Sequence, residues 1–234
     1  MAPNHNRYVE TRARGVTALA LASFMIALAA FASRVAGADA AVQDAFDPRL
    51  GGPLVRRERA VLGSPEARIV VLELSSFKCT HCRAFHETVF PKLREKYVGP
   101  GKVQWVVINA SNNPEDQSSQ IFLIARYALR QGKYWDIVDG LFQVGLRPPD
   151  VLADFVAKSP LIDRGDLETH LRDPSVHAAV AADFAEYVQL HIRGTPTFLV
   201  RRLDRNGVWA ETRLEDFQPL DFFERVLDEL LKTQ

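Results

Sequence analysis

Residues 69–86 read IVVLELSSFKCTHCRAFH, and this stretch decides the fold of the 234-residue chain. It begins with an apolar run rich in β-branched residues, which predicts a strand covered on both faces, as at the centre of an α/β sheet. The run leads into a C-x-x-C motif at residues 79–82 that contains both cysteines of the chain. Apolar residues then continue at helical spacing, which predicts a helix over residues 79–97 with a kink at Pro91. The cysteine pair therefore lies where a buried strand passes into a helix.

The rest of the chain continues the α/β pattern. Further strands are predicted at residues 59–62, 103–108, 197–200 and 208–212, with a hairpin turn at Asn206-Gly207 between the last two. A helical insert at about residues 113–191 separates the third strand from the fourth, and its helices begin near Asn113, Tyr134, Asp150, Gly165 and Pro174. An amphipathic helix at residues 222–231 closes the chain. The strand, helix, strand order around the cysteines indicates a parallel βαβ unit.

The first 40 residues differ in composition from the rest. Three arginines (Arg7, Arg12 and Arg14) precede an apolar run at residues 16–32, and small residues follow it. This arrangement is typical of a secretory signal, so residues 1–40 are predicted to be a cleaved signal peptide, with an uncleaved N-terminal anchor as the alternative. In either case the rest of the chain is predicted to lie outside the cytoplasm, in the periplasm or another extracytoplasmic compartment.

The remaining composition suits one exported globular domain. Residues 41–53 have no apolar period and are predicted to be a linker, followed by the domain at residues 54–234. Outside the signal segment, basic and acidic residues nearly balance, so there is no electrostatic case for a nucleic-acid partner. A domain of this size can bury an adequate core without disulfides, so its two cysteines are available for chemistry.

The cysteine pair alone allows three interpretations: a redox pair, half of a metal site or a structural disulfide. Zinc needs four ligands, and Cys79, Cys82 and His86 leave such a site short, with no second C-x-x-C motif to complete it. A disulfide between cysteines three residues apart closes a very small loop and constrains the unfolded chain little. A redox pair is therefore favoured and no metal ligand is assigned, while metal binding, including copper delivery, stays as an alternative. His86 is interpreted as an ordinary solvated or packed residue.

The position of the pair makes its two sulfurs unequal. At the start of a helix the sulfur of Cys79 meets unpaired backbone N–H groups and the positive end of the helix dipole, whereas Cys82 lies one turn further in. Cys79 is therefore predicted to be the exposed thiolate and Cys82 its sheltered partner. Lys78 and His81 are near enough in sequence to stabilise the thiolate. Each unit by which its pKa falls moves the pair by about 30 mV toward a stronger oxidant.

Glu73 interrupts the apolar strand six residues before Cys79. An ionised carboxylate inside such a strand is costly unless it is paired or hydrated. A protonatable acid beneath Cys82 would take and return the proton that this thiol must exchange as the disulfide opens and closes. The alternative is a strand residue that faces outward, and the sequence leaves both interpretations open.

These residues resemble the thioredoxin superfamily, and more closely the DsbA-like thiol-disulfide oxidoreductases of the bacterial cell envelope. The matching positions are Glu73, F-x-C-x-H-C at residues 77–82, K-Y-W at residues 133–135, L-F at residues 141–142 and G-T-P-T-F at residues 194–198. The resemblance implies a thioredoxin fold with an inserted helical subdomain. It also implies a cis bond between Thr195 and Pro196 that faces the cysteines, where the Thr195 main chain can pair with an extended substrate peptide.

Two positions depart from the family pattern. Thr80 stands where the family prototype has proline, and this leaves the redox potential open. Lys78 stands where the family often has an apolar residue, which alters the expected peptide-binding surface. Thr195 occurs in isomerase and reductase relatives as well, so it does not set the direction of the reaction.

The resemblance implies an envelope enzyme that introduces disulfides into exported proteins with unpaired cysteines. A substrate thiolate would attack the Cys79–Cys82 disulfide at Cys79, and no cofactor beyond this redox-active disulfide is expected. A membrane protein is implied as the partner that re-oxidises the pair. A disulfide isomerase or reductase is the alternative within the same fold, and a metallochaperone or a non-catalytic peptide-binding module is the alternative from another class.

Overall fold

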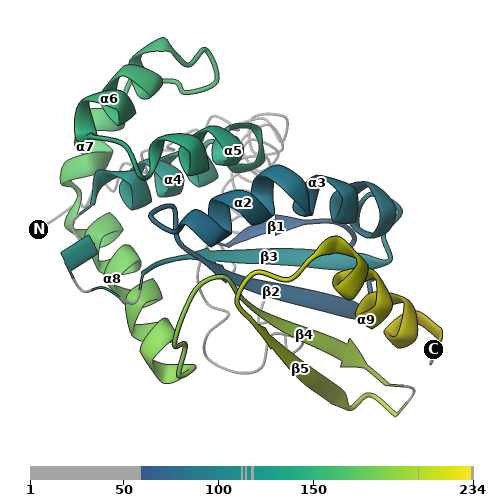
Figure 1. Ribbon diagram of the computed structural model, residues 1–234. Helices are drawn as coiled ribbons and strands as arrows, with labels where there is room; N and C mark the ends of the chain where they lie inside the picture. Colours follow the sequence, from purple (N-terminus) through teal and green to yellow (C-terminus); the bar gives the residue numbers. More distant parts are fainter. Residues whose placement is uncertain (1–58, 112, 114, 117–118, 205, 233–234) are drawn as a thin grey trace, which may run out of the picture. The chain divides into compact units, whose positions relative to one another are not determined.

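A computed structural model describes residues 59–111, 113, 115–116, 119–204 and 206–232 (Figure 1). The predicted signal or anchor at residues 1–40 and the predicted linker at residues 41–53 lie outside these ranges. Within the described ranges, no helix has the length and apolar character needed to cross a membrane.

A five-stranded sheet forms the centre of the domain. Its strands are β1 (Ala60–Leu62), β2 (Ile69–Ser75), β3 (Val103–Asn109), β4 (Thr197–Leu203) and β5 (Trp209–Glu215), in the spatial order β1-β3-β2-β4-β5. The pair β2 and β3 is parallel, as the βαβ order predicts, and the other neighbouring pairs are antiparallel. No residue of β2 is more than 3% exposed, which explains its nearly continuous apolar sequence.

The helix after the cysteines is interrupted, as the position of Pro91 predicts. It consists of α2 (Thr80–Thr88), the short α3 (Phe90–Leu93) and the π-helical turn η3 (Arg94–Val98). Pro91 lies in the first turn of α3, where its missing N–H leaves no hydrogen bond unmade. The closing helix α9 (Leu220–Lys232) covers the same face of the sheet, because the rings of Phe85 on α2 and Phe223 on α9 lie 5.5 Å apart.

The helical insert lies between β3 and β4. Its helices are α4 (Gln120–Arg130), α5 (Tyr134–Val144), α6 (Pro149–Lys158), α7 (Leu167–Arg172) and α8 (Pro174–Gln189). Figure 1 shows α4 and α5 beside α2, and α8 near the ends of β2 and β3. Tyr187 on α8 fixes this last contact, because its hydroxyl donates to the carbonyl oxygens of Ser75 and Ile108 at 2.8 and 3.2 Å. The fold is thus a thioredoxin fold with an inserted helical subdomain, as predicted.

One local prediction was wrong. The first helix of the insert was expected to begin at Asn113, but α4 begins at Gln120. Asn113 instead closes a short turn, because its side-chain oxygen accepts from the N–H of Glu115, and the helix starts only where the apolar stripe starts. The hairpin turn predicted at Asn206-Gly207 does lie between β4 and β5, and the Asp204 carboxylate accepts from the N–H groups of Asn206 and Val208 there.

Candidate active site

Cys79 lies where β2 has ended and α2 begins. Its backbone is extended (φ −110°, ψ 124°), and it is the N-cap residue of α2, with its Sγ atom accepting from the N–H of Cys82 at 3.3 Å. The sulfur therefore faces the unpaired N–H groups and the positive end of the helix. Cys82 lies one turn in and is fully buried, with the N–H of Ser76 3.5 Å from its Sγ atom.

The two thiols differ strongly in acidity. The pKa of Cys79 is lowered to about 5. The hydrogen bond from the Cys82 side chain contributes most, followed by one from Thr195 and those from the N–H groups of Cys82 and His81, while partial burial opposes the shift. Burial, followed by the hydrogen bond and the charge of Cys79, raises the pKa of Cys82. The two cysteines are unpaired in this structure, so at neutral pH Cys79 is a thiolate and Cys82 a thiol.

Thr195 and Pro196 lie against Cys79, although more than a hundred residues separate them in sequence. The bond between them is cis, as the resemblance implies, and β4 begins at the next residue. The carbonyl oxygen of Thr195 is 3.1 Å from the Sγ atom of Cys79. A pocket of about 370 Å³ adjoins this contact, and its lining includes Arg193, Thr195 and Asp216. The fold therefore places an open main-chain segment beside the exposed sulfur.

His81 is exposed between the two cysteines. Its Nδ1 atom lies 2.7 Å from Oδ1 of Asp216, and this hydrogen bond, followed by the charge of Asp216, raises the pKa of His81. Asp216 follows β5 with a positive φ of 64°, and its carboxylate also accepts from the N–H of Phe217. Asp216 could not be identified from the sequence, because 135 residues separate it from His81.

Lys78 and Thr80 flank the first cysteine at the surface. The Nζ atom of Lys78 lies 3.2 Å from Oδ1 of Asp116, and Thr80 occupies the first position of α2. Lys78 also lines a groove of about 370 Å³ whose apolar walls include Ile121 and Leu152. Lys78 therefore brings a cation to a groove next to Cys79 whose lining also includes Gln120 and Arg147.

Glu73 faces the interior, so the outward-facing alternative for this residue was wrong. Its side chain is fully buried on β2. One carboxylate oxygen pairs with Nε2 of His86 at 2.9 Å, and the other accepts from Nε1 of Trp105 at 2.8 Å. Both oxygens thus have partners, which is what a buried carboxylate requires.

His86 is packed inside the protein and pairs with the buried Glu73, so it is more than the ordinary residue that was expected. The ring of Phe142 stacks on it with centroids 4.0 Å apart. Burial opposes a charge on the imidazole, but the carboxylate of Glu73 and then that of Asp139 raise the pKa of His86 to about 9. The signal available in the sequence was its spacing, because His86 is four residues after Cys82 and so lies on the same face of α2.

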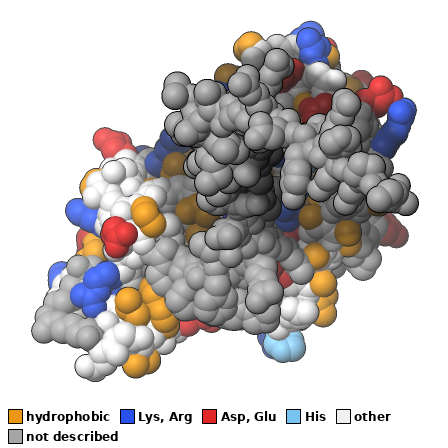
Figure 2. Space-filling view, turned by 180° about the vertical axis from the view of Figure 1, so that it is seen from behind, with side chains coloured by type: hydrophobic (Ala, Val, Ile, Leu, Met, Phe, Trp, Pro, Cys, Tyr) orange, Lys and Arg blue, Asp and Glu red, His pale blue; other side chains and the backbone are white. Residues whose placement is uncertain are grey.

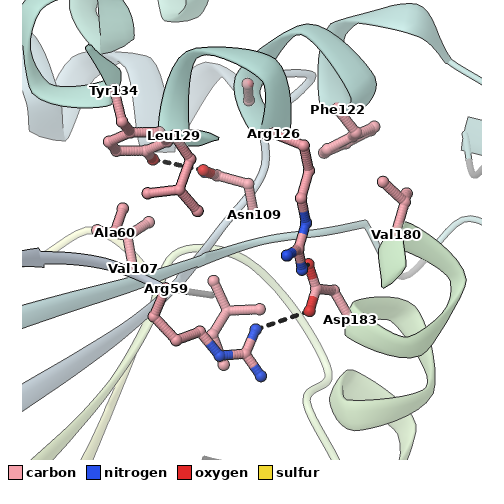
Figure 3. Close-up of a pocket in the computed structure, with 12 residues that line it drawn as sticks. Arg59, Ala60, Val107, Asn109, Phe122, Arg126, Leu129, Tyr134, Val180 and Asp183 are labelled. Carbon is pink, nitrogen blue, oxygen red and sulfur yellow. Dashed lines mark hydrogen bonds and ion pairs between the residues drawn. The ribbon is translucent and has the colours of Figure 1, made fainter. Parts of the chain in front are cut away.

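A further pocket lies away from the cysteines, between β1, α4 and α8. Figure 3 shows Arg59 and Arg126 converging on Asp183, with Arg59 Nη1 2.6 Å from the carboxylate. Its volume of about 20 Å³ holds about one water molecule, so it is no substrate site. Over the described residues, no cluster of three or more His, Cys, Asp or Glu side chains is arranged to hold a metal ion.

Comparisons with known proteins agree with this geometry. A family model described as Thioredoxin matches residues 56–214. A Bacillus cereus protein named "Probable disulfide bond formation protein D" is 30% identical over 149 residues, which cover 59% of this chain and 68% of that protein. The Bacillus subtilis disulfide bond formation protein D is 24% identical over 162 residues, or 64% of this chain and 70% of that protein.

Solved structures show the same fold. Wolbachia pipientis alpha-DsbA1 has a TM-score of 0.62 and 23% identity, over 74% of this chain and 91% of that chain. Oxidised BdbD from Bacillus subtilis has a TM-score of 0.60 and 20% identity, over 75% of this chain and 94% of that chain. The family match, the fold and the unequal cysteines at the start of α2 lead to one assignment. The chain belongs to the thioredoxin family, within which it is a DsbA-like thiol-disulfide oxidoreductase.

Proposed function

We propose that this enzyme oxidises cysteine pairs in exported proteins, with Cys79 and Cys82 as its redox-active disulfide. A substrate thiolate attacks Cys79 Sγ, the Cys79–Cys82 bond breaks, and Cys82 leaves as a thiolate that takes up a proton. A second substrate thiolate then attacks the substrate sulfur of the mixed disulfide, and Cys79 leaves as a thiolate. The substrate loses two electrons and gains a disulfide, while the enzyme becomes the dithiol.

The stabilised thiolate at Cys79 is the observation that carries the proposed direction. Its pKa of about 5 lies some 3.5 units below the usual value of about 8.5. Since each unit corresponds to about 30 mV, the shift makes the pair about 100 mV more oxidising. Cys79 is only half-buried and solvent screens its contacts, so about 100 mV is an upper limit for the change in reduction potential. A stable leaving thiolate favours the dithiol form, which is the property of a disulfide donor.

The remaining parts of the proposal concern the site and its surroundings. We propose that the Thr195 main chain, beside Pro196, pairs with the extended substrate, because its carbonyl oxygen lies next to Cys79. His81, Lys78 and Thr80 then adjust the potential and the docking surface. The signal-like pattern at residues 1–40 supports action outside the cytoplasm. The proposal also includes a membrane protein that re-oxidises the pair, as the resemblance to the envelope oxidoreductases implies.

Redox titration in glutathione buffers tests the direction. The oxidase proposal expects a potential well above about −270 mV, together with a midpoint near pH 5 for alkylation of Cys79 in the reduced protein. Cys82→Ser is the control that retains the nucleophile but cannot close the disulfide. A potential near about −270 mV with an alkylation midpoint above about pH 7 would indicate a reductase instead. Tight stoichiometric zinc or copper binding without thiol exchange would indicate the metallochaperone alternative.

A further inference from the structure

The groove that Lys78 lines next to Cys79 combines an apolar floor with a basic rim. On the floor, Ile121 and Leu152 are buried, at 1% and 8% exposure, whereas Lys78 and Arg147 are exposed at the rim. None of the described residues that line it is acidic. We call this cavity of about 370 Å³ the basic groove. Its volume falls in the range of sites that bind small ligands, roughly 300 to 1,000 Å³.

The packing of the end of α5 holds the basic groove close to the reactive sulfur. Gly145, which follows α5 and lines the groove, lies against the backbone just before the cysteines. A Cβ atom built on Gly145 would be 2.1 Å from the carbonyl oxygen of Phe77, so only glycine permits this approach. Lys78 lines the groove and is the residue directly before Cys79. An extended chain spans about 3.3 Å per residue, so a polypeptide joined to Cys79 reaches the groove within a few residues.

Two helices begin at the basic groove and add to its positive potential. Ser119 is the N-cap of α4 and makes no side-chain capping hydrogen bond, and Pro149 is the first residue of α6. Both residues line the groove, so the positive ends of two helix dipoles lie at the same place as the two cations. Asp150 offsets part of this effect in the first turn of α6, but it does not line the groove.

Arg147 is the cation that remains available to a ligand. Lys78 already has a partner, because its Nζ atom lies 3.2 Å from Oδ1 of Asp116. Arg147 makes no side-chain hydrogen bond or ion pair with any other residue in the described part of the chain. The face of the molecule in Figure 2 differs from the groove, since basic and acidic side chains are interspersed on it. The basic groove is therefore a site where charges of one sign gather around apolar side chains.

We propose that the basic groove binds a segment of the substrate protein in which an apolar side chain and a carboxylate lie within a few residues of the reacting cysteine. The apolar side chain packs on Ile121 and Leu152. The carboxylate pairs with Arg147, whose planar guanidinium can donate two parallel hydrogen bonds to it, and Lys78 is the second cation. The occupant is the substrate because the groove continues from Cys79, so a chain held at this sulfur passes over it.

The inference rests on the proposed oxidation of substrate cysteines and names the substrates that this reaction favours. Oxidised enzyme is mixed with reduced dithiol peptides that have a leucine and a test residue on both sides of each cysteine, so that either chain direction presents them to the groove. The test residue is glutamate, glutamine or lysine. The rate of disulfide formation is measured by acid quenching and chromatography. It is divided by the rate of the same peptide with uncharged hydroxyethyl disulfide, which removes the effect of peptide charge on thiol acidity.

Wild type is expected to oxidise the glutamate peptide about tenfold faster than the lysine peptide, with the glutamine peptide between them. An exposed charge pair changes a rate by up to about fivefold, and the lysine adds a repulsion of similar size. This preference should fall as ionic strength rises, because salt screens exposed charges. Serine in place of leucine should slow the glutamate peptide by about fivefold, since the apolar floor then has less to bury.

Substitutions in the groove test whether Arg147 reads the charge. Arg147→Gln should reduce the preference for glutamate over lysine to about threefold, and Arg147→Glu should invert it, which loss of a merely structural role would not do. Lys78→Gln should have a smaller effect, because Lys78 is already paired with Asp116. Arg225→Gln on α9 removes one exposed charge away from the groove and should keep the wild-type preference. Comparing two peptides within one enzyme cancels any change in its reduction potential.

The outcomes separate the inference from the proposed function. Equal rates for the three peptides in wild type, or the same preference in wild type and Arg147→Glu, would overturn the inference and leave the oxidase proposal standing. A loss of preference in Arg225→Gln as large as in Arg147→Gln would show that net charge, and not the groove, selects the peptide. Failure of oxidised wild type to oxidise any of the peptides would overturn the proposed function, and the inference with it.

Discussion

The thiolate of Cys79 should make the stability of the reduced enzyme depend on pH. The pKa of this thiol is about 5 in the folded protein and about 8.5 in an unfolded chain. A group whose folded pKa is lowered contributes stability that is present above the unfolded pKa and lost as pH falls through the folded one. The contribution of Cys79 is therefore complete above about pH 8.5 and absent below about pH 5.

The magnitude follows from the shift. A difference of about 3.5 units corresponds to about 5 kcal/mol of unfolding free energy. Because Cys79 is only half-buried, solvent screening reduces this, and we expect about 2 to 3 kcal/mol between the two ends of the pH range. Reduced Cys79→Ser lacks the titrating thiol, so the difference in stability between it and reduced wild type should grow with rising pH.

Urea unfolding of reduced wild type and reduced Cys79→Ser, at several pH values from about 4.5 to about 9, measures this difference. The oxidised wild type is the control, because neither cysteine titrates once the disulfide has formed, so its profile should lack the rise. A wild-type advantage that stays constant across this pH range would show that Cys79 is not stabilised as a thiolate, and the case for an oxidase would lose its main support.

Two further substitutions test contacts around the cysteines. Asp216→Asn removes the carboxylate that raises the pKa of His81, so an NMR titration of the His81 ring should show a lower midpoint, and an unchanged midpoint would refute the contact. Glu73→Gln leaves His86 buried without its anionic partner and should lower the unfolding free energy by about 3 to 5 kcal/mol in urea unfolding. The exposed Glu87→Gln should change it by less than about 1 kcal/mol, and a similar loss in both would argue against the buried pair.

The sequence was sufficient to predict those parts of the structure that the pattern of neighbouring residues determines. The apolar run of β2 is continuous because both faces of the strand are covered, and the cysteines follow it directly. Their unequal roles come from their positions at the start of a helix, which the spacing predicts. The sequence analysis placed the start of α4 too early because Asn113 and Pro114 are residues typical of a helix start. The helix begins only next to its first buried residue, Ile121.

The contacts that the sequence did not predict join distant segments. Asp216 reaches His81 only because β5 ends beside the start of α2, and nothing in the local sequence of either residue indicates the other. His86 was within reach of prediction, because it is one helical turn after Cys82 and faces the strand that carries Glu73. Its role was missed because a histidine on a helix is usually an ordinary residue, and only burial against a carboxylate changes that interpretation.

The fold itself makes the two cysteine sulfurs unequal in exposure and acidity, and the chemistry depends on this difference. β2 ends beneath the start of α2, so one sulfur meets free N–H groups at the surface, while the other is enclosed one turn later. The surface sulfur is then a good leaving group, and the enclosed one holds its proton. A pair built in this way reacts at Cys79 first, and Cys82 reacts only once Cys79 is already joined to another sulfur.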